Sequence, residues 1–108
     1  MKVCALIGKS TCPWFRPPSG AYDDRVVQLA GQQGYYTIYW TADSADWRPG
    51  IDAAAVKERL LRYARPGAIL VQHLTSVQSA EVLPEVLRTL KERGYELVTV
   101  SEFLATAD

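Results

Sequence analysis

Apolar residues follow helical and strand spacing in alternating short stretches from residue 22 onward. This alternation is typical of consecutive βα units, which build a parallel sheet covered by helices. Helices are expected over 24–33, between Asp52 and Pro66, ahead of Gly94, and from Ser101 to Leu104. Strands are expected at 14–16, 35–41, 68–71 and 97–100. The pattern therefore predicts an α/β fold with about four parallel strands and three main helices, in a single domain over residues 1–108.

Capping residues mark the ends of the predicted helices. Asp23 and Asp52 can accept hydrogen bonds from first-turn amides, and Gly34 and Gly94 follow the last turns. Pro84 is expected near the first turn of the third helix, where a missing amide hydrogen is tolerated. The positions expected to face the core are Val26, Val27 and Ala30, then Val56, Leu60 and Ala64, and then Leu83, Val86, Leu87 and Leu90.

The stretch 35–41 is apolar on both faces, which predicts a buried strand that is covered on both sides. Pro13, Pro17 and Pro18 exclude a helix in the preceding segment. A sheet of only four parallel strands would leave both edges and part of one apolar face open. We therefore expect a partial fold that is completed by further polypeptide.

Charge and hydropathy argue against several kinds of partner. Twelve basic residues balance twelve acidic ones, so there is no electrostatic reason to expect nucleic acid or an anionic membrane surface. No apolar run reaches the roughly 20 residues that span a bilayer, and no signal peptide is recognised, which leaves a cytoplasmic or an exported parent open. Cys4 and Cys12 match no zinc spacing and are expected to be ordinary thiols.

Three polar clusters fall where predicted strands end, which is where active sites collect in parallel α/β folds. In the first cluster, Arg16 either serves a site or forms a structural ion pair with Asp43 or Asp46. Both of those aspartates can equally be turn residues, because Asp is favoured in turns. His73 is either structural or a proton-transfer group, since imidazole exchanges protons near neutral pH.

At these clusters the sequence resembles the polysaccharide deacetylase family, the NodB-type carbohydrate esterases that remove N-acetyl groups from chitin-like and peptidoglycan sugars. Residues 15–22 (FRPPSGAY) look like the family's third motif, 43–50 (DSADWRPG) like its fourth and 71–73 (VQH) like its fifth. The likeness covers about residues 13–104. It implies the C-terminal half of a NodB-type distorted (β/α) barrel and a carbohydrate substrate.

The resemblance also implies roles for individual residues. Arg16 would orient a catalytic base that is not on this chain, Asp46 would position His73, and His73 would be the general acid that protonates the departing amine. Ser19 stands where the family usually has tyrosine, and Val71 where it often has leucine. The residues that would contact substrate are Pro18, Ser19, Trp47 and Val71.

The metal ligands of the family belong to two motifs, an Asp-Asp pair and a His-x-x-x-His pair, that would precede Met1. His73 is the single histidine, so this chain alone is not expected to bind the zinc or similar divalent metal that the complete domain implies. One hypothesis is therefore a fragment of a carbohydrate deacetylase, a hydrolase of carbon–nitrogen bonds, that works with a complementing N-terminal half. The alternative is a non-catalytic module that forms a homodimer through its open sheet edge and holds sugars on Trp40, Trp47 and its tyrosines.

Overall fold

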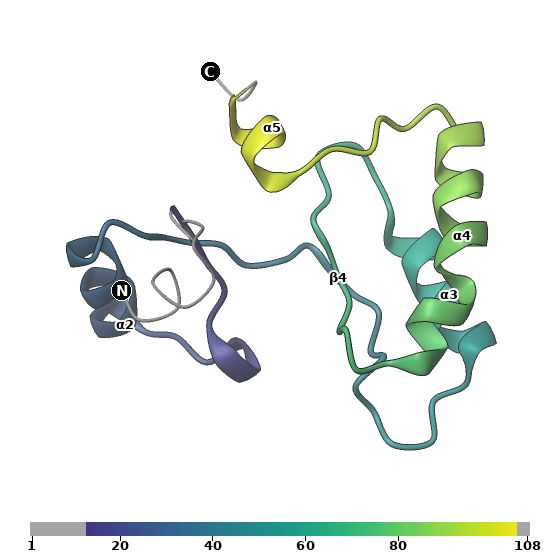
Figure 1. Ribbon diagram of the computed structural model, residues 1–108, viewed down its shortest axis with the longest axis horizontal. Helices are drawn as coiled ribbons and strands as arrows, with labels where there is room; N and C mark the ends of the chain where they lie inside the picture. Colours follow the sequence, from purple (N-terminus) through teal and green to yellow (C-terminus); the bar gives the residue numbers. More distant parts are fainter. Residues whose placement is uncertain (1–12, 106–108) are drawn as a thin grey trace, which may run out of the picture. The chain divides into compact units, whose positions relative to one another are not determined.

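The structure, a computed structural model, describes residues 13–105. The chain divides into two compact units, Met1–Tyr39 and Trp40–Asp108, and each is described by itself (Figure 1). The predictions for Cys4 and Cys12 lie outside the described residues. Within residues 13–105, no helix combines the length and the hydrophobicity needed to cross a membrane.

The first unit contains one pair of parallel strands and one helix. Its elements are β1 (Trp14–Phe15), the 3-10 turn η1 (Pro18–Gly20), α2 (Asp24–Gln32) and β2 (Tyr36–Thr37). Trp14 lies opposite Tyr36 in the parallel register. Helix α2 begins as predicted, because the Asp23 carboxylate accepts a hydrogen bond of 2.9 Å from the amide of Val26. Val26 is half-buried, but the expected inward position of Val27 is wrong, since its side chain is 42% exposed.

The predicted strand over 35–41 is shorter and less buried than expected. Only Tyr36 and Thr37 form β2, and the next strand begins at Ala42. Tyr35 is buried while Tyr36 is 68% exposed, so the segment is covered on one side rather than on both. Among the described residues β2 pairs with β1 alone, and a two-stranded ladder does not supply the second layer that a fully buried strand requires.

The second unit contains the other strand pair and most of the helical structure. Its elements are β3 (Ala42–Asp43), α3 (Ala53–Tyr63), β4 (Leu70–Val71), α4 (Val77–Glu92) and α5 (Val100–Ala105). Strands β3 and β4 are parallel, with Ala42 opposite Leu70 and Asp43 opposite Val71. Asp52 caps α3 as predicted and accepts a hydrogen bond of 2.8 Å from the amide of Ala55. The chain leaves both strands in the same direction, so the segments that follow them begin at the same edge of the ladder.

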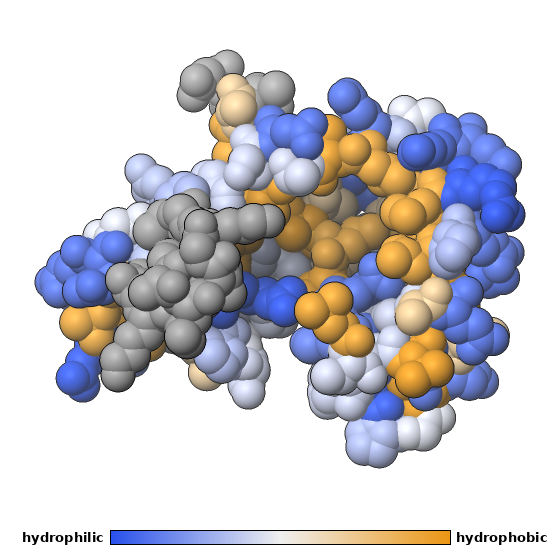
Figure 2. Space-filling view, in the orientation of Figure 1, coloured by the Kyte–Doolittle hydropathy of each residue, from blue (hydrophilic) through white to orange (hydrophobic). Residues whose placement is uncertain are grey.

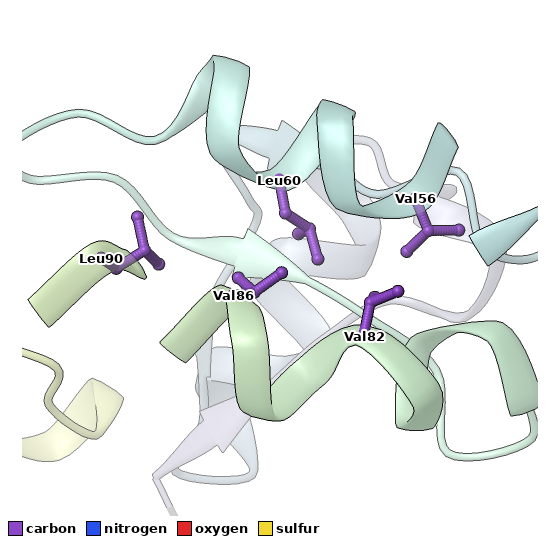
Figure 3. Close-up of a cluster of buried hydrophobic side chains, with 5 residues drawn as sticks. All are labelled: Val56, Leu60, Val82, Val86 and Leu90. Atoms are coloured by element: carbon purple, nitrogen blue, oxygen red, sulfur yellow. The ribbon is translucent and has the colours of Figure 1, made fainter. Parts of the chain in front are cut away.

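Helices α3 and α4 lie side by side and enclose the hydrophobic core of the second unit (Figure 1). In Figure 3, Val56 and Leu60 of α3 point toward Val82 and Val86 of α4, and Leu90 continues the same face. Val56 and Leu60 are almost completely buried, as their spacing predicted. The core therefore consists of the apolar faces of α3 and α4, which contact each other directly.

Two predictions for α4 are corrected. Pro84 lies in the middle of the helix rather than near its first turn, because Ser76 caps the helix eight residues earlier. Pro84 is on the exposed side, where the carbonyl group that loses its partner can be hydrated. Leu87 is 39% exposed, and the buried face consists of Ser79, Val82, Val86 and Leu90.

The predicted strand at 97–100 is wrong. Leu97 and Val98 are 38% and 40% exposed, and within the described residues the segment joins no ladder. β-propensity alone cannot form a strand that has no neighbour. The closing helix exists, but Thr99 caps it instead of Ser101, and its hydroxyl accepts a hydrogen bond of 3.1 Å from the amide of Glu102.

The α/β class, the four short parallel strands and the three main helices are confirmed. The strands form two separate pairs, and no closed barrel is formed within residues 13–105. A hollow of about 320 Å³ lies in the second unit between β4, α4 and the segment before α5. Figure 2 shows hydrophobic side chains gathered around this hollow. Its lining includes Leu70, Leu83, Leu87, Leu97 and Phe103.

Candidate active site

The loop after β3 is shaped by Asp43, which acts as a turn residue. One of its carboxylate oxygens accepts a hydrogen bond of 2.8 Å from the amide of Ala45, and the other accepts one of 3.1 Å from the indole Nε1 of Trp47. Its backbone carbonyl accepts a hydrogen bond of 3.0 Å from Nε of Arg59 on α3. The turn interpretation of Asp43 is thus the one that the geometry supports.

Ala45 turns the chain so that Asp46 points inward. Ala45 is buried and has a φ of 57°, a left-handed conformation that costs a residue with a Cβ on the order of 1 kcal/mol. The Asx turn of Asp43 and the burial of Ser44 hold this conformation. The strained conformation of Ala45 therefore places the carboxylate of Asp46 inside the unit.

Asp46 is a buried carboxylate whose oxygens are held from three sides. Its side chain has no exposed surface. Oδ1 lies 2.7 Å from Nδ1 of His73. Oδ2 accepts hydrogen bonds of 2.8 Å from the backbone amide of His73 and 2.5 Å from the hydroxyl of Ser79. Of the two carboxylates in the D-x-x-D pattern, Asp46 is the one that contacts the histidine.

The environment of Asp46 favours its ionised form. Burial by itself raises the pKa of this carboxyl, but the hydrogen bonds from Ser79 and from the amide and imidazole of His73 outweigh burial and hold the pKa below its ordinary value. Asp46 is consequently a carboxylate at neutral pH. A carboxylate at 2.7 Å requires a proton on Nδ1 of the imidazole, which leaves Nε2 as the nitrogen available to other groups.

His73 follows β4 and lies where the protein meets solvent. Its side chain is 38% exposed, while its backbone amide and Nδ1 are both bound to Asp46. Its carbonyl accepts a hydrogen bond of 3.1 Å from the amide of Ser76, the residue that caps α4. The ring is fixed at one edge and accessible at the other, which is the geometry that a proton-transfer group needs.

Trp47 and Val71 belong to the same two motifs as Asp46 and His73. Trp47 is 57% exposed, its indole is held by Asp43, and the guanidinium of Arg48 lies 5.5 Å from its ring centroid. Val71 is 4% exposed, two residues before His73 in the ordered end of β4. Contact of either side chain with a substrate stays a prediction.

The remaining candidate residues belong to the first unit. Arg16 follows β1 and is exposed, as are Pro18 and Ser19. Ser19 has a φ of 58° within η1, and the amide of Gly20 donates a 3.0 Å hydrogen bond to the carbonyl of Pro17, so the segment is a tight turn. The proposed pairing of Arg16 with a carboxylate of the second unit, and the place of Pro18 and Ser19 in one site with His73, stay predictions.

Ser79 is the site residue that the sequence interpretation missed. It lies in the first turn of α4 and its hydroxyl binds Asp46. Its signal was present in the sequence, because Ser79 occupies the same helical stripe as Val82, Val86 and Leu90. A serine on an apolar stripe requires a buried hydrogen-bond partner.

The described residues do not fit a family-type metal site. Within residues 13–105, no group of three or more histidine, cysteine or acidic side chains is close enough together to hold a metal ion. Both oxygens of Asp46 and Nδ1 of His73 are already engaged with each other and with Ser79.

A parallel α/β framework with a carboxylate-held imidazole at the strand ends defines a general acid–base type of site. The chain is 35% identical over 96 residues to a peptidoglycan-N-acetylglucosamine deacetylase of Bacillus cereus, covering 83% of this chain and 44% of the relative. No family model matches it.

Solved structures show the same relationship. The structure of Bacillus subtilis PdaA, a family 4 carbohydrate esterase, superimposes on this chain with a TM-score of 0.87 and 26% sequence identity. The match covers 99% of this chain and 47% of the PdaA chain. A family 4 pseudoenzyme from Bacillus anthracis matches 88% of this chain and 33% of its own with a TM-score of 0.82 and 35% identity. The chain belongs to the polysaccharide deacetylase family, carbohydrate esterase family 4, and it spans less than half the length of each of these relatives.

Proposed function

We propose that this chain supplies the general-acid part of a carbohydrate deacetylase whose complete domain hydrolyses N-acetyl groups on peptidoglycan-like or chitin-like sugars. The observation that carries the proposal is the contact of 2.7 Å between Asp46 Oδ1 and His73 Nδ1, with the rest of the imidazole reaching solvent. Relatives named as peptidoglycan deacetylases support the substrate class.

In the proposed reaction, water adds to the carbonyl carbon of the acetyl group. The bond between this carbon and the amide nitrogen then breaks, and acetate and a free amine form. The departing nitrogen must take up a proton, because an amide anion is a poor leaving group. His73 would donate that proton from Nε2 while Asp46 balances the positive charge of the imidazolium. Arg16 would orient the base carboxylate contributed by another part of the domain, and Trp47, Val71, Pro18 and Ser19 would line the substrate site.

The base and the metal ligands of the family belong to motifs that this sequence does not contain, so the chain by itself is proposed to be inactive. The apolar hollow of the second unit is where we place the complementing N-terminal part of the domain. The relatives are more than twice as long as the part that this chain matches, which leaves room for such a partner, and Leu83, Leu87 and Leu97 offer it an apolar surface.

Reconstitution tests this function. The chain is mixed with the N-terminal half of a family member that carries the Asp-Asp and His-x-x-x-His motifs, and acetate release from N-acetylglucosamine oligomers is measured. Activity is expected from the complex, with a loss of about 10² to 10⁴ in kcat for His73→Gln. An intact, folded complex that releases no acetate, or a His73→Gln complex as active as the parent, would contradict the proposal.

A second candidate is a non-catalytic module, and the 35% identity to a pseudoenzyme favours it specifically. In this function the exposed Trp47 and the tyrosines hold a sugar, and the open apolar surface pairs two copies of the chain. Sedimentation velocity and calorimetric titration with N-acetylglucosamine oligomers test it. Dimers that bind sugar without any reconstituted activity support it, and monomers that bind no sugar exclude it.

A further inference from the structure

Ser79 is a buried hydroxyl group on a helix face that is otherwise apolar. Its exposed fraction is 4%, and its neighbours on that face are Val82, Val86 and Leu90. Its backbone amide donates a hydrogen bond of 3.1 Å to the hydroxyl of Ser76, which is the normal capping interaction. Its own hydroxyl has a different partner, Oδ2 of Asp46.

The torsion that orients an aspartate carboxylate is soft, so hydrogen bonds must fix its plane. Two donors converge on Oδ2 of Asp46, namely the amide of His73 from the end of β4 and the hydroxyl of Ser79 from the first turn of α4. With Oδ2 held between two elements, Oδ1 is directed at Nδ1 of His73. Without the hydroxyl of Ser79, the carboxylate of Asp46 would be held only by His73, which is the residue that it must orient.

We propose that Ser79 is a positioning residue, whose hydroxyl locks the Asp46 carboxylate so that the His73 ring keeps its neutral-form proton on Nδ1 and presents Nε2 outward. The inference deepens the proposed function and rests on it only for the use of the pair in catalysis. The other charged groups of the loop are engaged elsewhere, because Asp43 holds Ala45 and Trp47, Arg59 binds the carbonyl of Asp43, and Arg48 lies over the indole.

The test uses the tautomer of His73, which is the single histidine and therefore gives unambiguous ring signals in ¹⁵N NMR of the chain. Spectra are recorded at alkaline pH, where the ring is neutral. Ser79→Thr keeps a hydroxyl group. The valine of Ser79→Val has nearly the same shape as threonine but no hydroxyl group. We expect Ser79→Thr to retain the Nδ1–H tautomer and Ser79→Val to shift the ring toward the Nε2–H tautomer.

Ser76→Ala is the matched control, because it weakens the start of the same helix without removing the hydroxyl that binds Asp46. It should lower the melting temperature and leave the tautomer unchanged. Equal tautomer populations in the Thr and Val variants, or a shift of the same size in Ser76→Ala, would overturn the inference. Ser79→Ala serves as a second hydroxyl-free variant if Ser79→Val does not fold.

The reconstituted complex adds a kinetic readout. Ser79→Val is expected to lower kcat by about ten-fold with little change in KM, as removal of a supporting hydrogen bond typically does. A complex without any activity would count against the proposed function, while the tautomer measurement would still decide the role of Ser79. The two failures can thus be told apart.

Discussion

The two units of the chain contain similar local structure but differ in how much of it they bury. Both contain a pair of parallel strands and a helix capped by aspartate. In the second unit, Val56, Leu60, Val82, Val86 and Leu90 form a continuous buried core. Helix α2 of the first unit has no fully buried residue, and its Val27 and Leu29 are 42% and 50% exposed.

This difference indicates where a site can be held rigidly. The Asp46–His73 pair lies in the unit that has its own core, and its partners come from β4 and α4. The motif of Arg16 lies in the first unit, whose helix α2 has no buried residue among the residues that the structure describes. Local sequence signals can therefore form a helix without the packing that fixes a side chain for chemistry.

Truncating one apolar residue in each unit should give the largest contrast. Leu60→Ala is expected to lower the free energy of unfolding by about 3 kcal/mol, because it opens a cavity in the core. Val27→Ala, on an exposed helix position, should cost about 0.5 kcal/mol or less. Urea denaturation followed by circular dichroism measures both values. Equal losses would show that the first unit also contributes core packing.

The pH dependence of stability should depend on Asp46. Because its pKa in the folded protein is lowered, its contribution is complete above the ordinary carboxyl range and is lost as the pH falls through the lower folded pKa. Asp46→Asn should cost about 2 kcal/mol at neutral pH, and the difference from the parent should shrink in acid. Asp23→Asn in the first unit is the control. Thermal melts at several pH values would contradict the prediction if the Asp46→Asn difference stayed constant.

The smallest contrast concerns the two helix caps. Asp52→Ala should lower the free energy of global unfolding by about 1 kcal/mol, because α3 belongs to the core. Asp23→Ala removes an equivalent hydrogen bond but should increase hydrogen exchange mainly in the amides of α2. Exchange measured by NMR distinguishes local from global effects. The corresponding serine variants keep a capping oxygen and should restore most of the protection.

Capping residues and helical stripes allowed much of the fold to be predicted. Asp23 and Asp52 fixed the starts of α2 and α3, because their hydrogen bonds are formed by residues three positions away. Placement at predicted strand ends suggested that Asp46 and His73 share one edge of the sheet, and the family resemblance implied their pairing, which the contact between them confirms. These features depend on local spacing or on a simple topological rule.

Features that depend on distant packing could not be predicted in this way. Tyr36 and Leu97 have strand-forming side chains, but their burial depends on neighbours that spacing does not reveal. Pro84 was placed near a helix start, although it lies on an exposed side where a helix interior tolerates it. Ser79 escaped notice because its partner is 33 residues away.

The hydrogen bond from Arg59 to the carbonyl of Asp43 joins the loop to the middle of α3. The loop that presents Asp46 is therefore attached to a helix of the hydrophobic core and not only to the strand that precedes it. Heat that loosens α3 should release the Asp46–His73 contact in the same transition, so this contact and the folded core should melt as one cooperative unit.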